Sequence, residues 1–323
     1  MKGLQLAQLL KAYPTVPTSP DHDSHLSYDD RLIVRAVSPA DIPDVRAYLE
    51  AHIETSLFLL SNLSELGIFA SSSPMSGNFL LIEDSDALAG VFCLTRKGDL
   101  LAQTGGRTDC VPEMLAACRE EPFPIKGVIA EWQVANALWG LLTARPGFSP
   151  VYRSKSVVYR LGDCPNRVEL PAGVMTRALT IADYDAWDPV DRAFHADEGL
   201  NVMSDAKRRM SAYRMRASIE GWWGAFADGL LVSTACLNAG YGGFAQVGGV
   251  YTRPAFRRRG LAQRVMYELM RHHADRSGLR EIVLFAAEQN LAARALYETM
   301  GFAERGRFGL FFGKATEDLT PIA

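Results

Sequence analysis

The chain has 323 residues, of which 48% are hydrophobic and 22% are charged, and its formal net charge is −3. These values exclude a disordered or fibrous chain, and they indicate a globular protein with room for two domains. The slightly acidic balance gives no overall attraction to nucleic acid or to anionic membranes. The five cysteines include no C-x-x-C pair, so neither a disulfide framework nor a zinc site is indicated, and we expect a reducing, cytoplasmic location.

Residues 1–30 are expected to lie outside the folded domains. The segment MKGLQLAQLLKAYP predicts a short amphipathic helix that ends at Pro14, and its interrupted apolar residues are unlike the core of a signal peptide. The following residues, 14–30, are rich in Pro, Ser and Asp and predict an irregular connection. No stretch approaches the roughly 20 continuous apolar residues that a membrane helix needs, so we expect no membrane partner.

An internal repeat begins after this segment. RAVSPAD at residues 35–41 matches RALTIAD at residues 177–183. Each follows a short extended stretch and then places Ser or Thr ahead of Asp, which is typical of the start of a helix. Both halves of the chain are therefore expected to open with a strand followed by a helix.

The repeat continues along both halves. NFLLIEDSDALAGVFCL (78–94) and WWGAFADGLLVSTACL (222–237) each predict a β-hairpin with an acidic turn. ALWGLLTARPGF (137–148) and ALYETMGF (295–302) each predict a helix that ends at glycine before a phenylalanine opens the next strand.

A division between the halves is expected near residue 166. LGDCPNRVELPAG (161–173) has the proline, glycine and mixed charge of a linker. We therefore predict a mixed α/β fold of two related domains, 31–165 and 166–323, each with a central, mostly antiparallel mixed sheet flanked by helices.

The second half contains a strand with two interior glycines, FAQVGGVYT, followed by FRRRGLAQRVM. Glycines inside a strand often mark a bulge or a close approach of another group, so an extended ligand arm could lie along Gly248 and Gly249. An apolar stripe predicts a helix over 260–277. Its N-terminus, with glycine and arginines before it, offers N–H groups and positive charge to an anion. The pattern favours a diphosphate over a solvated basic turn or a nucleic-acid contact.

Residues 247–313 resemble the C-terminal part of the GNAT superfamily, the GCN5-related N-acetyltransferases. Two motifs, in the order of the family, carry the resemblance. The first is Gln or Arg, two residues, Gly, one residue, and Gly or Ala, which stands here as Arg257, Gly260 and Ala262. The second stands as NLAARALYETMGF, in which Asn290 opens a helix and Tyr297 lies two turns in. The resemblance implies two GNAT-like domains in tandem, acetyl-CoA as cosubstrate, and no metal.

The same resemblance implies roles for particular residues. Backbone groups of Val250, Tyr251 and Thr252 are expected to bind the pantetheine arm, with one N–H polarising the thioester carbonyl. The pyrophosphate is expected at the N–H groups and side chains of Arg257, Arg258, Arg259, Gly260, Leu261 and Ala262. Asn290 is expected near the pantetheine end while also capping its helix. Tyr297 is expected to protonate the CoA thiolate, the alternative being an ordinary packing aromatic.

A general base is harder to assign. Some family members carry a carboxylate on the pantetheine-binding strand, but Gln246 and the residues after it include no acid. FHADEG supplies His195 and Glu198 as candidates, because a histidine can titrate near neutrality. A solvated loop explains that segment equally well. Of the pair Trp222 and Trp223, at most one is expected to face the acceptor.

The first half departs from both motifs. GGRTDCVPE lacks the Arg, Gly and Ala spacing, and Trp139 stands where the repeat would place Tyr297. A tryptophan has only an N–H donor and cannot replace the phenol. We therefore expect residues 31–165 to form a degenerate GNAT-like domain that scaffolds or completes the acceptor site.

The favoured function is direct acetyl transfer from acetyl-CoA to a primary amine of a small molecule, amino acid or peptide. A non-catalytic acyl-CoA-binding or regulatory protein is the alternative, and a longer acyl group is a third possibility. The acidic FHADEG segment suggests a cationic amine as acceptor. We expect no nucleic-acid partner, and a monomer or a homodimer.

Overall fold

A computed structural model of the chain describes residues 32–162, 164–200 and 205–315. The N-terminal helix and the irregular segment predicted within residues 1–30 lie outside the described residues. Within these residues no helix is long and apolar enough to cross a membrane.

The first half is built from six strands and four α-helices among the described residues, and the predicted hairpin and the helix before Gly147 are confirmed. In chain order the elements are β1 (Leu32–Ala36), η2 (Pro39–Asp41), α1 (Ile42–Ala51), α2 (Ile53–Leu66), β2 (Gly77–Asp84), β3 (Ala87–Thr95), β4 (Asp99–Gln103), α3 (Val111–Cys118), β5 (Gly127–Glu131), α4 (Trp132–Thr143) and β6 (Phe148–Leu161).

The second half repeats this order, and its predicted hairpin, glycine-containing strand and helices are confirmed. Its elements are β7 (Val174–Ala178), η3 (Ile181–Asp183), α5 (Tyr184–Asp197), α6 (Ala206–Ala217), β8 (Trp222–Ala227), β9 (Leu230–Tyr241), β10 (Phe244–Thr252), η4 (Pro254–Phe256), α7 (Leu261–Ser277), β11 (Glu281–Ala287), α8 (Leu291–Thr299) and β12 (Ala303–Ala315).

The repeated heptapeptide is a structural unit that turns the chain from strand to helix. Arg177 donates two hydrogen bonds of 2.7 Å to the two carboxylate oxygens of Asp183, which also accepts from the backbone and hydroxyl of Thr180. The hydrogen bonds from Arg177, the largest cause, hold the pKa of Asp183 at about 2. Arg35 and Asp41 form the same bidentate pair at 2.8 and 2.9 Å in the first half. The repeat therefore preserves a charge-assisted capping motif.

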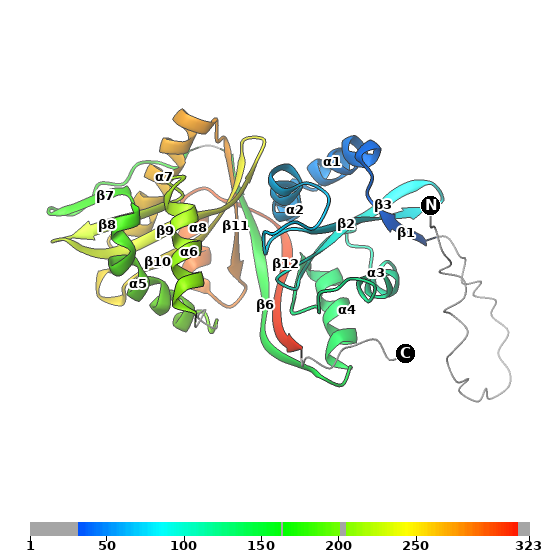
Figure 1. Ribbon diagram of the computed structural model, residues 1–323. Helices are drawn as coiled ribbons and strands as arrows, with labels where there is room; N and C mark the ends of the chain where they lie inside the picture. Colours follow the sequence, from blue (N-terminus) through cyan, green and yellow to red (C-terminus); the bar gives the residue numbers. More distant parts are fainter. Residues whose placement is uncertain (1–31, 163, 201–204, 316–323) are drawn as a thin grey trace. The chain divides into compact units, whose positions relative to one another are not determined.

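All twelve strands form one sheet, in the order β1-β2-β3-β4-β5-β12-β6-β11-β10-β9-β8-β7 (Figure 1). Only the β4–β5 and β10–β11 pairs are parallel. The two halves exchange their last strands at the centre, because β12 lies between β5 and β6 whereas β6 lies between β12 and β11. The mixed sheet predicted for the fold is confirmed, and it runs without a break through both halves.

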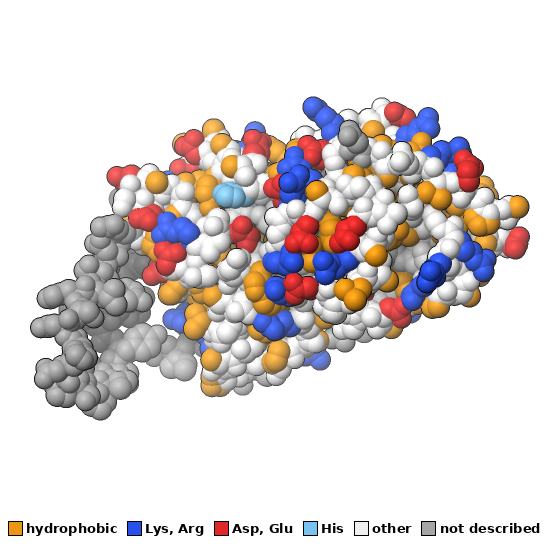
Figure 2. Space-filling model, turned by 180° about the vertical axis from the view of Figure 1, so that it is seen from behind, with side chains coloured by type: hydrophobic (Ala, Val, Ile, Leu, Met, Phe, Trp, Pro, Cys, Tyr) orange, Lys and Arg blue, Asp and Glu red, His pale blue; other side chains and the backbone are white. Residues whose placement is uncertain are grey.

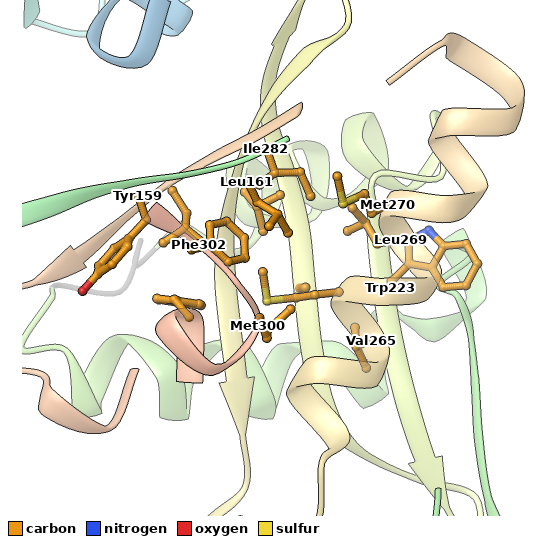
Figure 3. Close-up of a cluster of buried hydrophobic side chains, with 14 of the residues drawn as sticks. Tyr159, Leu161, Trp223, Val265, Leu269, Met270, Ile282, Met300 and Phe302 are labelled. Atoms are coloured by element: carbon orange, nitrogen blue, oxygen red, sulfur yellow. The ribbon is translucent and has the colours of Figure 1, made fainter. Parts of the chain in front are cut away.

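Helices cover both faces of the sheet. In the second half, α7 and α8 pack on one face over a core that includes Val265, Leu269 and Phe302. Two residues of β6, Tyr159 and Leu161, belong to this same core, and Figure 3 shows them beside Phe302 and Ile282. The last strand of the first half is thus part of the hydrophobic core of the second half.

Polar contacts also join the halves. Arg160 on β6 donates to Glu54 of α2 at 2.7 Å and to Glu281 of β11 at 2.5 Å.

The face in Figure 2 shows basic and acidic side chains intermingled, without a large area of one sign. This distribution agrees with the small net charge and gives that face no broad basic surface for nucleic acid.

The described residues from Leu32 onward form one compact unit. The division into two domains near residue 166 stays a prediction. Because β6 and β12 are exchanged, a cut at that position would leave each half without the neighbouring strand that the other half supplies.

The exchange predicts that both halves unfold together. Phe308 on β12 is 1% exposed and stacks on Phe285 of β11 with ring centroids 4.4 Å apart. Phe308→Ala should lower the free energy of unfolding by about 3–5 kcal/mol because it leaves a cavity. Urea unfolding followed by tryptophan fluorescence and circular dichroism should show one shifted transition.

Phe69→Ala is the matched control, because Phe69 is 61% exposed. It should change the stability by less than about 0.5 kcal/mol. Two separate transitions, only one of which moves in Phe308→Ala, would contradict the idea that the halves form a cooperative unit.

Candidate functional site

A cavity of about 400 Å³ opens where the parallel strands β10 and β11 separate. They are paired only from Phe244–Val247 to Glu281–Leu284. Beyond this point β10 pairs only with β9, and β11 pairs only with β6. The facing backbone edges of 248–250 and 285–287 therefore line an opening inside the sheet, where unpaired N–H and C=O groups can bind an extended ligand.

The two glycines of β10 shape this opening. Gly249 has φ +58, in the left-handed region, and the ladder with β9 is irregular between Gly248 and Tyr251. A Cβ atom at Gly248 would lie 2.2 Å from Asn238 Nδ2, and one at Gly249 would lie 2.8 Å from the ring of Trp222. The sequence predicted that another group approaches these glycines closely. The groups that do so in the structure are the side chains of Asn238 and Trp222, which fix the bulge that separates the strands.

The arginine-rich loop leads from β10 into α7. Gly260 caps the helix with φ +73 and Arg258 also has a positive φ of 62. Within the described residues, the backbone N–H groups of residues 258–263 form no hydrogen bond. Six consecutive free N–H groups lie at the start of this 17-residue helix, beside exposed guanidinium groups, and such an arrangement can bind an anion.

The predicted cofactor residues are divided between the cavity and this loop. Val250 and Asn290 line the cavity. Tyr251 is buried in the core beneath α5, and Thr252 forms a 2.8 Å hydrogen bond with Ser233, so neither side chain lines the cavity. Residues Arg257, Arg258, Arg259, Gly260, Leu261 and Ala262 lie outside it, at the N-terminus of α7.

Tyr297, Asn290 and Glu198 meet at one wall of the cavity. Asn290 caps α8 by accepting a 3.1 Å hydrogen bond from the N–H of Ala293, and it donates to Glu198 Oε1 at 3.0 Å. Burial raises the pKa of Glu198, the hydrogen bond from Asn290 opposes this rise, and the nearby charge of Asp197 adds to it. Burial raises the pKa of Tyr297 even more, so its phenol stays protonated at neutral pH.

His195 lies in the last turn of α5, three residues before Glu198, which is the C-cap of this helix. The FHADEG segment is therefore the end of a helix and not a loop. Its Nδ1 lies 2.7 Å from the carbonyl oxygen of Asp191 and 3.3 Å from Asp191 Oδ2. Burial lowers the pKa of His195, but the hydrogen bond and charge of Asp191 outweigh this effect and raise it. No hydrogen bond to a described residue involves Nε2 of His195, so this atom can accept a proton.

An ion-pair network supports His195 from behind. Arg209 on α6 pairs with Asp191 at 2.7 Å and with Asp188 at 2.5 Å, and its guanidinium lies over the ring of Trp187. The Arg209 side chain is only 4% exposed. Because a buried charge is costly without a partner, this network fixes the orientation of α5 against α6.

The first half contributes directly to the cavity. Tyr152, Ser154 and Ser156 of β6 and Phe58 of α2 line it. Ser154 and Ser156 share a 3.1 Å hydrogen bond and are almost completely buried. These four side chains give the first half a part of the cavity lining. That the first half completes an acceptor site stays a prediction.

The corresponding region of the first half is filled by its own residues. Glu131 at the end of β5 accepts a 2.5 Å hydrogen bond from the N–H of Gly106, where the arginine-rich loop stands in the second half. Trp139 packs edge to face on Phe148 in the core. These contacts place a carboxylate against a backbone N–H that an external anion would need. The degenerate character of the first half stays a prediction.

Sequence reasoning missed several residues of the cavity. It identified Tyr297, His195, Glu198, Asn290 and Val250, and the structure brings all five together. It gave no role to those on α6, on β6 and on the buried face of α5, namely Arg209, Arg216, Tyr152, Ser154, Ser156, Asp191 and Trp187. Asp188 and Asp191, three residues apart on a predicted helix, were a weak signal of a shared basic partner. Trp222 lines the cavity whereas Trp223 packs in the core.

Comparison with known proteins agrees with this geometry. Residues 187–302 match the family described as the acetyltransferase (GNAT) family. The chain is 30% identical over 173 residues to a mycothiol acetyltransferase from Catenulispora acidiphila, which covers 51% of this chain and 54% of that protein. The chain thus spans about half the length of the curated relative that it matches.

Solved structures support the fold. A GCN5-related N-acetyltransferase from Sphaerobacter thermophilus superposes with a TM-score of 0.54 at 20% identity, covering 90% of this chain and 97% of that chain. A tandem GNAT protein from the clavulanic acid biosynthesis pathway gives a TM-score of 0.51 at 14% identity, covering 90% of this chain and 100% of that chain.

The buried network predicts unequal effects for two arginines that bind the same carboxylate. Arg209→Gln should lower the free energy of unfolding by about 3–5 kcal/mol, because it leaves Asp191 and Asp188 without their buried partner. Arg192→Gln, which removes the other ion pair of Asp188 from a side chain that is 49% exposed, should cost less than about 1 kcal/mol. Urea unfolding at pH 7 measures both, and equal effects would show that the network does not stabilise the α5–α6 packing.

Proposed function

Because residues 187–302 match the acetyltransferase (GNAT) family, we propose that the chain transfers an acetyl group from acetyl-CoA directly to a primary amine of a small molecule, amino acid or peptide. The observation that carries the proposal is the separation of β10 from β11, which opens a cavity lined by the buried phenol of Tyr297 and the half-buried carboxylate of Glu198. The same strand β10 leads into the free N–H groups at the start of α7.

The residues fit the parts of acetyl-CoA. The free N–H groups of residues 258–263 and the exposed arginines match a pyrophosphate. The edges of 248–250 and 285–287 match the amide-bearing pantetheine arm, which can pair with an open strand edge. Acetyl-CoA supplies an activated thioester, and the chain positions it beside Tyr297 and Glu198.

The transfer needs two proton movements. A bond forms between the amine nitrogen and the acetyl carbon, the carbon–sulfur bond breaks, the amine loses a proton and the thiolate gains one. Tyr297 Oη would donate the proton to the sulfur, because its raised pKa keeps it protonated and no described residue occupies its hydroxyl by hydrogen bonding. Glu198 would accept the proton of the amine directly or through water, and His195 is the second candidate base.

The cavity lining and the relative both guide the choice of acceptors to test. The name of the relative from Catenulispora acidiphila concerns mycothiol, so thiol-containing amines belong in any acceptor panel. Contributions from Tyr152, Ser154 and Phe58 indicate that the first half helps to select the acceptor.

A combined binding and turnover experiment tests the assignment. Isothermal calorimetry should show acetyl-CoA binding to the wild type, weakened at least tenfold by Arg258→Glu with Arg259→Glu, because two phosphate-facing charges are reversed. Arg271→Glu, on an exposed site further along α7, is the control and should bind normally. Tyr297→Phe should keep binding but release free thiol about 100-fold more slowly in an amine panel.

The possible outcomes separate the competing functions. Absence of acetyl-CoA binding to the wild type would refute the cofactor assignment. Binding without thiol release on any amine would favour a regulatory acyl-CoA-binding protein. Normal turnover in Tyr297→Phe would remove this tyrosine from the reaction and leave it as a packing residue.

The hydrogen bond from Asn290 predicts a pH effect. Glu198 must be ionised to act as a base, so kcat/KM should fall as pH drops through its raised pKa. Asn290→Ser keeps a side-chain oxygen for the helix cap but removes the N–H that stabilises the carboxylate. The acid limb should therefore move to higher pH in the variant, while the plateau changes little.

The control for this experiment is His195→Gln. It should lower activity modestly and leave the acid limb in place if Glu198 is the base. Disappearance of the limb in His195→Gln, with no shift in Asn290→Ser, would transfer the role to His195. The titration of the amine itself is common to all three enzymes and cancels in the comparison.

A further inference from the structure

One face of α6 forms a wall of the cavity. Arg209, Ala212, Tyr213 and Arg216 line it and stand at positions i, i+3, i+4 and i+7, which places them on the same side of the helix. Tyr213 is already occupied, because its hydroxyl donates to the carbonyl of Thr180 at 2.6 Å. The two arginines are the basic residues of this wall.

These arginines differ in their partners. Arg209 is fully paired with Asp188 and Asp191. Arg216 is half-buried, and its guanidinium forms no hydrogen bond or ion pair with any described residue. A guanidinium that is partly withdrawn from water and left unpaired has lost hydration without compensation. The proposed function gives Arg216 no role.

Arg216 lines the cavity, and its charge also acts on Cys236 of β9. Burial raises the pKa of the Cys236 thiol, whereas the charge of Arg216 opposes the rise. Cys236 lies on β9, on the cavity side that carries Trp222. Glu198 also lines the cavity and accepts a hydrogen bond from Asn290 at the start of α8. The cavity therefore has an unpaired positive group on α6 and a carboxylate at the α5–α8 wall.

Two further donors lie in this part of the cavity. Trp187 and Trp222 are 4% and 7% exposed and contact each other edge to face at 5.3 Å. Neither indole N–H has a hydrogen-bond partner within the described residues. Buried N–H groups without acceptors are rare and destabilising, so this end of the cavity has more donors than acceptors. A ligand group that supplies oxygen acceptors fits this imbalance.

We propose that the acceptor carries a carboxylate that binds Arg216, while its amine faces Glu198, so that the substrate is an amino acid or a peptide-like amino acid derivative. This inference rests on the proposed function and names the substrate class of the same site. A planar carboxylate matches a guanidinium in a bidentate geometry. This acceptor differs from the simple cationic amine that the acidic FHADEG segment suggests. The difference arises because the expectation from that segment did not include the arginines of α6.

Matched acceptors test the charge requirement. Acetyl transfer is measured for α-amino acids, β-alanine and γ-aminobutyrate, each beside its carboxamide and its decarboxylated amine. The wild type should prefer at least one acid over its amide by tenfold or more in kcat/KM. Arg216→Gln should remove that preference by raising KM for the acid about 10- to 100-fold, with little change for the amide and in the calorimetric affinity for acetyl-CoA.

Arg214→Gln is the matched control, since Arg214 lies two residues away on the same last turn of α6 but is exposed. It should behave as the wild type, which separates a general effect of helix-terminal charge from contact with the acceptor. Arg216→Lys should restore part of the acid preference. Thermal unfolding of each variant checks that the fold is intact.

Failure of this inference is distinguishable from failure of the proposed function. Equal use of acids and amides by a wild type that binds acetyl-CoA and releases thiol would overturn the carboxylate assignment alone. An equal loss for both acceptors in Arg216→Gln would do the same. If thiol release is absent, thermal shift with the same acids and with their N-acetyl derivatives decides: stabilisation of the wild type but not of Arg216→Gln supports the site, and no difference overturns it.

Discussion

The insertion of β6 between β11 and β12 is the constraint on which the rest of the structure depends. This strand is covalently part of the first half, yet its Tyr159 and Leu161 lie in the core of the second half and its Ser154 and Ser156 line the cavity. Its pairing to β11 over Ser156–Leu161 also leaves the opposite edge of β11 free to separate from β10. The strand exchange therefore stabilises the fold and at the same time opens the site.

The separation of β10 from β11 has a second cause in local packing. Asn238 and Trp222 occupy the space beside Gly248 and Gly249, and only glycine allows the strand to bulge around them. The backbone edge that results is unpaired on the cavity side, while on the other side the ladder with β9 is interrupted after Gly248 and resumes at Tyr251. A side chain at either position would force the bulge to move, so the two glycines act through the backbone and not through chemistry of their own.

The local parts of this arrangement were predictable from the sequence, whereas the parts that depend on distant pairing were not. Helix starts, hairpins, the glycine-containing strand and the Asn290–Tyr297 helix follow from caps, turns and periodicity within short windows, and the structure confirms them. The position of Ser154 and Ser156 depends on a pairing across 120 or more residues, which no local pattern specifies. Arg216 sits in a polar helix of low amphipathic contrast, so its orientation becomes apparent only once α6 is placed over the sheet.

Contacts at the end of α5 connect the arginine-rich loop before α7 to the cavity. Asp197 pairs with Arg257 at 2.7 Å, and the adjacent Glu198 accepts from Asn290 at the start of α8. The C-terminus of one helix is thus bonded both to the loop before α7 and to the cap of α8. Asp197 and Glu198 repel each other, and this repulsion contributes to the raised pKa of Glu198. Because Arg257 neutralises part of the charge on Asp197, and Asp197 acts on the neighbouring Glu198, the end of α5 links the electrostatics of the loop before α7 to those of the cavity carboxylate.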